Sequence, residues 1–328
     1  MTPLTMSRRV TLAVAMAAWG SFITWFTLSA SPNHLAKDFT WPWRAARILL
    51  QGHDPYVVMQ ATGGYPFNTP FLYPLPAAVI ALPLAPLPPA AAGAIFFGLG
   101  SGLLAFGLSR SREGLARLPL FVSAPFVMAA VLAQWAPLMM AAALFPSLQF
   151  LAAAKPNLGL ACWVYRPSWR GVIGGVVVAL IALALIPSWP LEWRSALATA
   201  PRYRGPVFQL AGVVLLLAVM RWRRPEGRLF LAMSVVPQLA LFYDQLPLWL
   251  VPTTVTRSVV LSALSWVAWW QWYPSRALGS SVAVAQPWIF WLIYVPALGL
   301  LLMPEHLRLR AKRETDVAPP ARAHEPTA

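Results

Sequence analysis

Acidic side chains are the scarcest chemical groups in this sequence, and they can be considered one by one. The 328 residues include only ten Asp and Glu, against 25 Lys and Arg. Six of these acids lie in the C-terminal tail or among loop arginines, where solvated ion pairs are the ordinary outcome. None lies in the middle of a long apolar run, where an ion-coupled carrier usually has one. The acids left for a functional role are Asp38, Asp54, Glu192 and Asp244.

Residues 37–56 hold the richest set of polar and aromatic groups. Thr40 is a suitable N-cap, Pro42 suits a first helical turn, and Gly52 suits a C-terminal stop. The segment therefore predicts a short helix at about 41–51. Its apolar face would carry Trp41, Ala45, Ile48 and Leu49, and its polar face Arg44, Arg47 and Gln51. This pattern is typical of an interfacial helix that lies along a membrane surface, with tryptophans at the level of the lipid headgroups.

Asp38 stands directly before this helix, at the predicted boundary between water and lipid. A carboxylate in that place can act as a general base for a hydroxyl group. Nearby cations can neutralise a phosphate as it leaves. The cations available are Lys37, Arg44, Arg47 and, farther along the chain, Lys155. Asp38 could equally cap the helix or pair with Lys37 or Arg44, and the residues alone leave these roles open.

Metal and cofactor chemistry finds no support in the sequence. The four histidines, His34, His53, His306 and His324, lie outside the apolar runs and lack metal-ligand spacing. Surface histidines are favoured over a cluster with Asp38 and Asp54. Serine nucleophile elbows, phosphate-binding glycine loops and dinucleotide fingerprints are absent. Cys162 is the only cysteine, which excludes an intramolecular disulfide. We therefore expect neither a metal nor a cofactor.

The composition predicts an all-α polytopic membrane protein. Hydrophobic residues make up 59% of the chain and charged residues 11%, whereas a soluble domain has about a quarter charged residues. The uncharged runs Val10–Ala30 and Val282–Met303 reach the roughly 20 residues that a spanning helix needs. Further apolar stretches lie at 71–87, 88–108, 118–133, 135–154, 171–188, 206–220, 229–243 and 256–273. We expect a membrane domain at 10–303 with about ten (8–12) transmembrane or half-spanning helices.

The placement of arginine predicts the topology. The formal charge of +15 is concentrated in short loops between apolar runs, which marks cytoplasmic loops and favours anionic lipid over nucleic acid as the partner. Residues 1–9 would be cytoplasmic, 31–70 an external loop, and 304–328 a disordered basic tail. We therefore expect a multi-pass protein of the cell (inner or plasma) membrane.

However, if segments 71–87 and 88–108 both crossed the membrane, the loop at Arg110 would face outward, so one of these two segments would be re-entrant. The orientation of the C-terminus stays open.

Proline adds a second prediction about these segments. The chain has 33 prolines, many of them within apolar runs. Proline removes helical hydrogen bonds, which a membrane tolerates only where protein or a water-filled cavity satisfies the freed carbonyl groups. Several segments should therefore be short or kinked, above all 135–165, where Pro146 and Lys155-Pro156-Asn157 interrupt the run.

Several of these motifs occur together in one known family. Asp38-Phe39, the amphipathic stretch and Gly52-x-Asp54-Pro55-Tyr56 resemble the first external loop of GT-C fold glycosyltransferases. They are most similar to glycosyltransferase family 87, the polyprenyl-phosphate-mannose-dependent mannosyltransferases. Residues 71–76 (FLYPLP) and 83–88 (PLAPLP) resemble the second membrane segment of that family, and Gln134 and Lys155-Pro156 are further matches. The resemblance extends over residues 10–250.

The resemblance implies a membrane hexosyltransferase that inverts the anomeric carbon. The donor would be a polyprenyl-phosphate sugar, with mannose or another hexose, and the acceptor a hydroxyl of a lipid or glycan at the external face. Asp38 occupies the position of the catalytic base. Arg44, Arg47 and Lys155 would bind the phosphate, with Lys37 beside them, and Asp54, Tyr56, Tyr243 and Asp244 would line the cavity.

The sequence also departs from the family pattern. Family members often have a histidine near a later external loop, whereas residues 236–245 contain none, and the chain is short for the family. Two other classes of function therefore remain open. One is a lipid or polyisoprenoid transporter that uses the same cavity without chemistry. The other is a non-catalytic membrane assembly partner.

Overall fold

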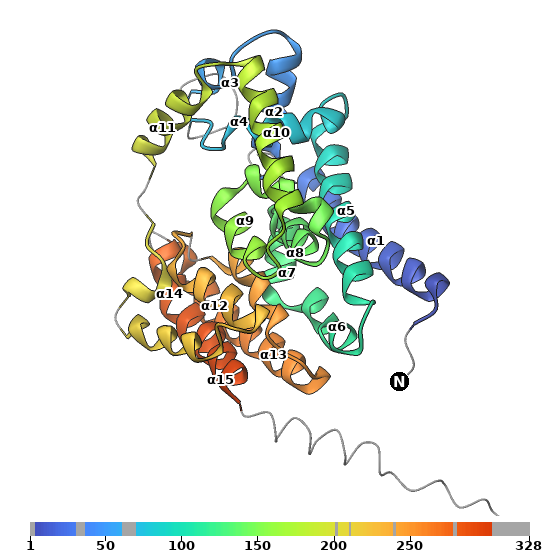
Figure 1. Ribbon diagram of the computed structural model, residues 1–328, viewed down its shortest axis with the longest axis vertical. Coiled ribbons are helices and arrows are strands. Elements are labelled where there is room, and N and C mark those ends of the chain that lie inside the picture. Colours follow the sequence, from blue (N-terminus) through green and yellow to red (C-terminus); the bar gives the residue numbers. More distant parts are fainter. Residues whose placement is uncertain are drawn as a thin grey trace, which may run out of the picture.

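A computed structural model describes residues 4–30, 37–60, 70–200, 203–209, 211–238, 241–277 and 281–303. The predicted tail at 304–328 and most of the stretch before Asp38 lie outside these ranges. Within them the chain is helical and contains no strand (Figure 1), so the all-α prediction is confirmed. Many elements are short and begin at a proline, as the proline pattern predicted. Pro146 opens the 3₁₀ helix η3 (Pro146–Ala153), and Pro156 follows the N-cap of α9 (Pro156–Trp163).

The long helices α1 (Met6–Ala30) and α5 (Pro89–Leu108) form a closely packed antiparallel pair. Small residues allow this approach: a Cβ added to Gly98 would come within 2.0 Å of the Ser21 hydroxyl oxygen. That hydroxyl donates to the carbonyl oxygen of Ala94 at 2.9 Å. Small-residue contacts of this kind are characteristic of helix pairs in membranes, where backbones approach through glycine.

Between these two helices, no helix within residues 37–60 and 70–88 is long enough to span a membrane by itself. The segment predicted at 71–87 forms α4 (Leu75–Ala81) and the 3₁₀ helix η1 (Leu82–Leu84). These ten residues make one short apolar helix, about 15 Å long at 1.5 Å per residue. That is half of the roughly 30 Å hydrocarbon core. This length fits the half-spanning alternative for this segment, and the loop after α5 lies beside the N-terminal end of α1.

Among the described residues, three helices are long and apolar enough to cross a membrane: α1, α5 and the composite helix Ala283–Leu302. Two bent pairs raise this number to five if each pair is one span. They are 112–122 with α7 (Ala124–Val131), bent by 61°, and α10 (Trp169–Leu185) with α11 (Trp189–Thr199), bent by 96°. Large apolar side chains such as Phe22, 59% exposed, and Ile173, 63% exposed, point outward from these helices. A bilayer would cover such surfaces.

The remaining elements complete the bundle and its two ends. They are α2 (Thr40–Leu50), α3 (Pro55–Val58), α6 (Arg112–Ala116), η2 (Leu118–Val122), α8 (Ala136–Leu144), η4 (Pro206–Phe208), η5 (Gly212–Arg221), α12 (Pro225–Val235), η6 (Phe242–Leu250), α13 (Val255–Trp272), η7 (Tyr273–Ala277), α14 (Ser281–Ile289), the π-helical turn η8 (Phe290–Tyr294) and α15 (Val295–Leu302).

The arginine-bearing loops meet at one end of the bundle, which we call the basic end. It includes the start of α1, α6, and the ends of α9 and α15, and it lies in the lower part of Figure 1. Four sets of hydrogen bonds connect these segments. Arg9 donates to Ser109 (3.2 Å), Arg117 to Glu226 (3.2 Å), Arg228 to the carbonyl oxygens of Val164 and Tyr165 (2.9 and 3.0 Å), and Arg221 to that of Leu302 (3.0 Å).

The helix predicted at 41–51 is present as α2, and it ends as predicted. Gly52 has φ +76°, the amide of Gly52 donates to Leu49, and that of His53 donates to Ile48. This is a Schellman motif, which satisfies the last carbonyl groups of the helix. The start differs, because Thr40 is inside the helix and its hydroxyl bonds the backbone of Lys37 instead of capping.

The surroundings of α2 also differ from the prediction of a helix with one free polar face. Trp43 and Ala46 belong to the main hydrophobic core, whereas Ala45 and Ile48 belong to a second cluster on the other side. The helix is therefore wedged between two apolar clusters. The periodicity could not reveal this, because a helix flanked by two partners has little need of a continuous polar face.

The geometry of an interfacial helix is found in α11 instead. It is set at 96° to α10, and it exposes Leu191 (70%) and Leu197 (43%). On its inner side the Trp193 indole donates to the carbonyl oxygen of Leu72 at 3.0 Å. A helix perpendicular to a spanning helix, with exposed leucines and a tryptophan, fits a position along a membrane surface. Figure 1 shows α11 with α2 and α3 at the end opposite the basic end.

Candidate functional site

Four segments that are distant in sequence bring polar groups together around the Lys155 ammonium. Its Nζ lies 3.2 Å from Oδ2 of Asp38, 3.4 Å from Oδ1 of Asp244, and 2.9 Å from Oε1 of Gln134. Asp38 precedes α2, Gln134 lies between α7 and α8, Lys155 is the N-cap of α9, and Asp244 is in the first turn of η6. We call these four residues the Lys155 cluster.

Asp38 is held in place by the break between α7 and α8. The Asp38 amide donates to the carbonyl oxygen of Leu132 at 3.0 Å, and the Phe39 amide donates to that of Ala133 at 3.2 Å. Ala133 has φ +49°, a left-handed conformation that is uncommon for a residue with a Cβ. The turn exposes two carbonyl groups to the 37–39 segment and leads directly to Gln134. Both Asp38 and Gln134 are thus positioned by one strained turn.

The charges of the Lys155 cluster do not balance. Two carboxylates, Asp38 and Asp244, face one ammonium. Burial lowers the pKa of Lys155, but the carboxylates of Asp244 and Asp38 outweigh burial and raise it, so this lysine stays charged. Tyr73 also bonds Asp38, and burial followed by the charge of Asp38 raises the pKa of this tyrosine well above its usual value. Tyr73 therefore remains a neutral hydrogen-bond donor to Asp38.

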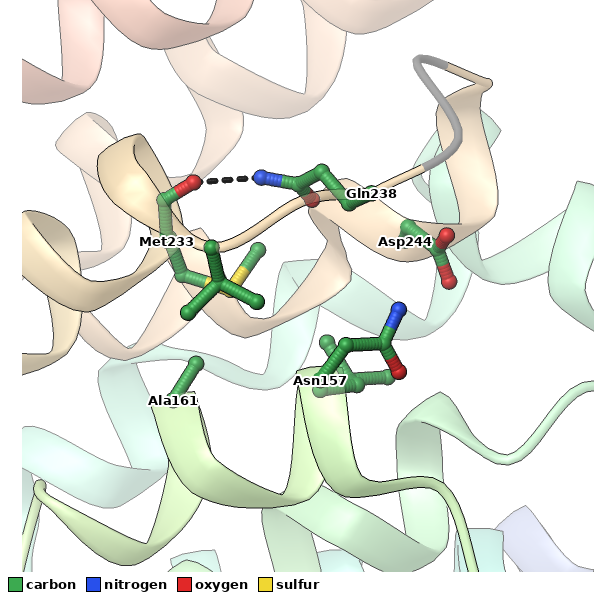
Figure 2. Close-up of a pocket in the computed structure, with 7 residues that line it drawn as sticks. Asn157, Ala161, Met233, Gln238 and Asp244 are labelled. Atoms are coloured by element: carbon green, nitrogen blue, oxygen red, sulfur yellow. Dashed lines mark hydrogen bonds between the residues drawn. The ribbon is translucent and has the colours of Figure 1, made fainter. Parts of the chain in front are cut away.

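Exposure differs among the three charged groups. The Asp38 side chain is 22% exposed, that of Lys155 12% and that of Asp244 3%. Asp38 is thus the group most open to a ligand. On the other side of Lys155, Asp244 lines a narrow crevice with Asn157 and Gln238, as Figure 2 shows. Asp38 does not line this crevice, and Lys155 bridges it to Asp244.

Tyr243 also belongs near the Lys155 cluster, as predicted. Its ring centroid lies 5.7 Å from the Lys155 ammonium, within the range of a cation–π contact. The structure therefore brings together four of the predicted site residues: Asp38, Lys155, Tyr243 and Asp244. Lys155 was predicted to bind phosphate, yet here it bridges two carboxylates.

Asp54 and Tyr56 are held by other contacts. Asp54 caps α3 by accepting from the amide of Tyr56 at 2.7 Å, and it lies beside Glu192 of α11. The Tyr56 hydroxyl donates to the carbonyl oxygen of Tyr73 at 2.7 Å. Tyr56 therefore supports the residue that bonds Asp38, whereas Asp54 serves the local turn. Neither belongs to the Lys155 cluster.

The predicted phosphate-binding cations of the 37–47 segment are half-buried. The Arg47 guanidinium packs 5.2 Å from the ring centroid of Trp43. The backbone of Lys37 is tied to Thr40 by hydrogen bonds, and burial lowers the pKa of its side chain. Arg44 is on the same helix and is likewise partly buried. These three residues flank the Asp38 loop without replacing Lys155 as the partner of Asp38.

Two residues of the site were not assigned a role from the sequence. Gln134 is an isolated amide in a long apolar stretch, and such a residue in a membrane segment is costly unless it has a polar partner. An amide in such an apolar stretch was therefore the signal from which a polar contact at Gln134 could have been predicted. Tyr73 precedes a proline-rich apolar segment and gives no comparable signal. No group of three or more His, Cys, Asp or Glu that could hold a metal occurs within the described ranges.

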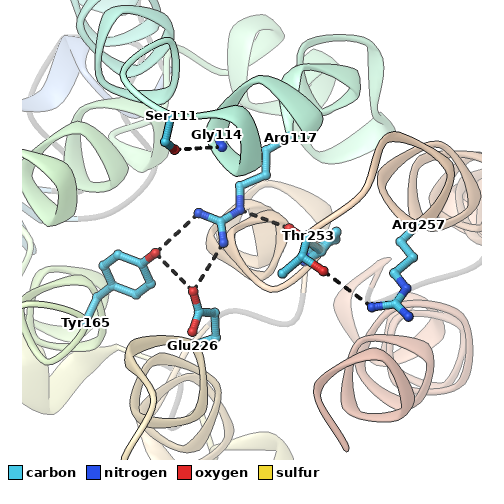
Figure 3. A network of polar contacts seen from close by, with 8 residues as sticks. Ser111, Gly114, Arg117, Tyr165, Glu226, Thr253 and Arg257 are labelled. Atoms are coloured by element: carbon cyan, nitrogen blue, oxygen red, sulfur yellow. Dashed lines mark hydrogen bonds and ion pairs between the residues drawn. The ribbon is translucent and has the colours of Figure 1, made fainter. Parts of the chain in front are cut away.

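A second polar network occupies the basic end, as Figure 3 shows. Arg117 is 4% exposed and donates to the carbonyl oxygen of Pro252 (3.0 Å), the hydroxyl of Tyr165 (3.3 Å) and the carboxylate of Glu226 (3.2 Å). Tyr165 donates to the same carboxylate oxygen at 3.3 Å. The expected arginine–glutamate pairing is present, but it is largely buried and joins four segments of the chain.

Comparison of the chain with known protein families, with curated proteins and with solved structures gives no match.

Proposed function

We propose that this protein is a membrane glycosyltransferase of the GT-C type, which transfers a hexose from a polyprenyl-phosphate sugar to an acceptor hydroxyl. The observation that carries the proposal is the convergence of Asp38, Gln134, Lys155 and Asp244, which come from four segments that are distant in sequence. Three of these positions also match the family motifs. Mannose is the sugar that the resemblance favours.

The arrangement of charge supports an external position for this site. Arginine loops mark the cytoplasmic side of a membrane protein, and here they gather at the basic end. Residues 6–30 of α1 lead from that end to the Asp38 segment over about 37 Å at 1.5 Å per residue. This length exceeds the roughly 30 Å hydrocarbon core. Asp38 would therefore act at the external headgroup region, where a lipid-linked donor and an aqueous acceptor can meet.

The reaction can be written with the groups at hand. Asp38 accepts the proton of the acceptor hydroxyl as its oxygen attacks the anomeric carbon. The bond from that carbon to the phosphate oxygen breaks with inversion, and the polyprenyl phosphate leaves with the electron pair. Lys155 holds Asp38 as an anion beforehand and would turn toward the phosphate as negative charge develops there. Tyr73 keeps the carboxylate of Asp38 oriented by its hydrogen bond.

The decisive test is an Asp38→Asn variant in a transfer assay with a polyprenyl-phosphate [14C]mannose donor and a membrane glycolipid acceptor. Asparagine keeps the size of the side chain but cannot accept the proton, so we expect transfer to fall about 10²–10⁴-fold. Asp54→Asn is the matched control, because Asp54 lies in the same segment and only caps α3. Transfer by Asp38→Asn at the wild-type rate would refute the proposal.

A non-catalytic role is the second candidate, and one observation favours it. Lys155, Asp38 and Asp244 satisfy one another and tie α9 and η6 to the segment before α2, as a structural clamp would. In that case Asp38→Asn would lower stability without removing any transfer activity, because the wild-type protein would show none. A transporter would move the lipid-linked sugar across vesicles while forming no new glycosidic bond, so the transfer assay together with a vesicle transport assay separates all three functions.

A further inference from the structure

A second cavity lies at the basic end, where Tyr165 just after α9 bonds its lining residue Glu226, whereas Lys155 precedes the first residue of the same eight-residue helix. Its volume is about 210 Å³, and it is lined by Glu113, Arg224, Glu226, Val251, Thr253 and Leu301. These residues come from α6, the start of α12, the segment before α13 and the last turn of α15. The cavity is therefore built at the junction of four elements.

The position of this cavity corresponds to the headgroup level of a bilayer. Leu301 is one residue from the end of the apolar helix Ala283–Leu302, and Arg221 donates to the carbonyl oxygen of Leu302 at 3.0 Å. The apolar helix thus ends at the residues that form the floor of the cavity, and an arginine side chain lies beside that end. Pockets between membrane helices on the basic side are where phospholipid headgroups bind.

The lining carries both signs of charge. Glu113 and Glu226 supply two carboxylates, Arg224 supplies a guanidinium, and Thr253 supplies a hydroxyl that accepts from Arg257 at 3.3 Å. Val251 and Leu301 form an apolar floor and are 2% and 1% exposed. Glu226 is already paired with Arg117 at 3.2 Å, so Glu113 adds a second carboxylate and Arg224 a guanidinium to the lining. A ligand that carries a cation and a phosphate together matches both kinds of group.

The geometry of Glu226 indicates which cation fits. Arg117 and Tyr165 both hold the Oε1 atom of Glu226, so the carboxylate is fixed in direction. Its other oxygen and the exposed carboxylate of Glu113 remain as acceptors for a donor in the cavity. A primary ammonium has three N–H donors and can bond both acids, whereas a trimethylammonium group has none. Arg224 is placed to meet the phosphate.

We propose that this cavity binds the headgroup of phosphatidylethanolamine from the leaflet at the basic end. The ammonium would bond Glu113 and Glu226, and the phosphate would bond Arg224 and Thr253. The proposal does not depend on the glycosyltransferase activity, because none of the residues that line this cavity belongs to the Lys155 cluster.

The test measures lipid retention by native mass spectrometry of the full-length protein in detergent. Phosphatidylethanolamine, phosphatidylcholine and phosphatidylglycerol with identical acyl chains are added at equal concentration. We expect phosphatidylethanolamine to bind about tenfold more tightly than either, since charge-assisted hydrogen bonds distinguish the headgroups. Glu113→Gln and Arg224→Gln should each reduce this preference to about twofold or less. The control Arg112→Gln changes an exposed arginine of the same loop and should preserve it.

Three outcomes would overturn the proposal. The wild-type protein could retain the three lipids equally, or the preference could survive both substitutions. Alternatively, soluble O-phosphoethanolamine could raise the thermal unfolding temperature as much as the lipid does, which would assign the cavity to a free aminophosphate. Because Glu113 is exposed, its replacement leaves the core untouched, and the unfolding temperature of Glu113→Gln without lipid verifies that the variant is folded.

Discussion

Replacing Lys155 by Met tests the electrostatic centre of the proposed site. Methionine keeps a long apolar stem but removes the ammonium that lies 3.4 Å from Asp244, whose side chain is 3% exposed. Removing one partner of a buried ion pair costs about 3–5 kcal/mol. The 22% exposure of Asp38 places the expected loss near the lower figure, at about 3 kcal/mol. For a chain of this size that corresponds to an unfolding temperature lower by about 4 °C.

The pH dependence of this loss has a definite sign. A buried carboxyl group that loses a neighbouring ammonium is harder to ionise in the folded state than in the unfolded chain. Such a group lowers the stability of the fold at a pH where it is ionised. This loss of stability disappears as the pH falls and the carboxyl group takes up a proton. The difference between Lys155→Met and wild type should therefore shrink between pH 8 and pH 5. Tryptophan fluorescence during thermal unfolding in detergent measures it.

The double variant Lys155→Met/Asp244→Asn supplies the control. Asparagine removes the buried negative charge of Asp244, so we expect the double variant to recover more than half of the lost stability. A double-mutant cycle measures this recovery as a coupling energy. Asp244→Asn alone should be the milder variant, because Lys155 keeps Asp38 and Gln134 as partners. If Lys155→Met unfolds at the wild-type temperature, or if the double variant is no more stable than the single one, the Lys155 cluster is not an ion-paired unit and the reasoning fails.

Three further predictions concern the neighbours of this site and the arrangement of the bundle. Gln134→Leu removes the amide that accepts from Lys155 at 2.9 Å and should lower stability by about 1–2 kcal/mol; an unchanged denaturant midpoint would contradict this. Gly98→Ala places a Cβ 2.0 Å from the Ser21 hydroxyl oxygen, so we expect a loss of about 1–3 kcal/mol from overpacking, partly recovered by adding Ser21→Gly. In a Cys162→Ala background, a cysteine at His53 should react with an impermeant maleimide in intact cells, whereas one at Arg112 should react only after permeabilisation; labelling of both from outside would disprove the orientation.

Local signals in the sequence predicted the local features correctly. The helix at α2, its stop at Gly52 and the breaks at Pro146 and Pro156 follow from backbone constraints that act within a few residues. The sign and position of charge also carried information, since the arginine loops of α6 and α12 do meet at one end. These features need no knowledge of which helices are neighbours.

Features that depend on partners were not predictable in the same way. The environment of α2 is set by two apolar clusters, one of which includes Ala182 of α10, more than a hundred residues away. Lys155 bridges two carboxylates because Asp244 comes beside it through η6. Neither contact produces a periodic pattern in the sequence from which it could be predicted. The count of about ten spans remains a prediction, since three to five helices in the described part of the chain are long and apolar enough.

The short length of α4 and η1 has a consequence for the whole topology. Had residues 71–87 crossed the bilayer, the loop at Arg110 would lie on the same side as Asp38. Instead, ten apolar residues are long enough for about half of the hydrocarbon core, so in the proposed topology α5 returns the chain to the side where α1 begins. The contact of Arg9 with Ser109 then joins the start of α1 to the end of α5 on one face. Asp38 and Glu113 belong to two different polar sites, the Lys155 cluster and the second cavity, and substitutions at the two sites should have additive effects on stability.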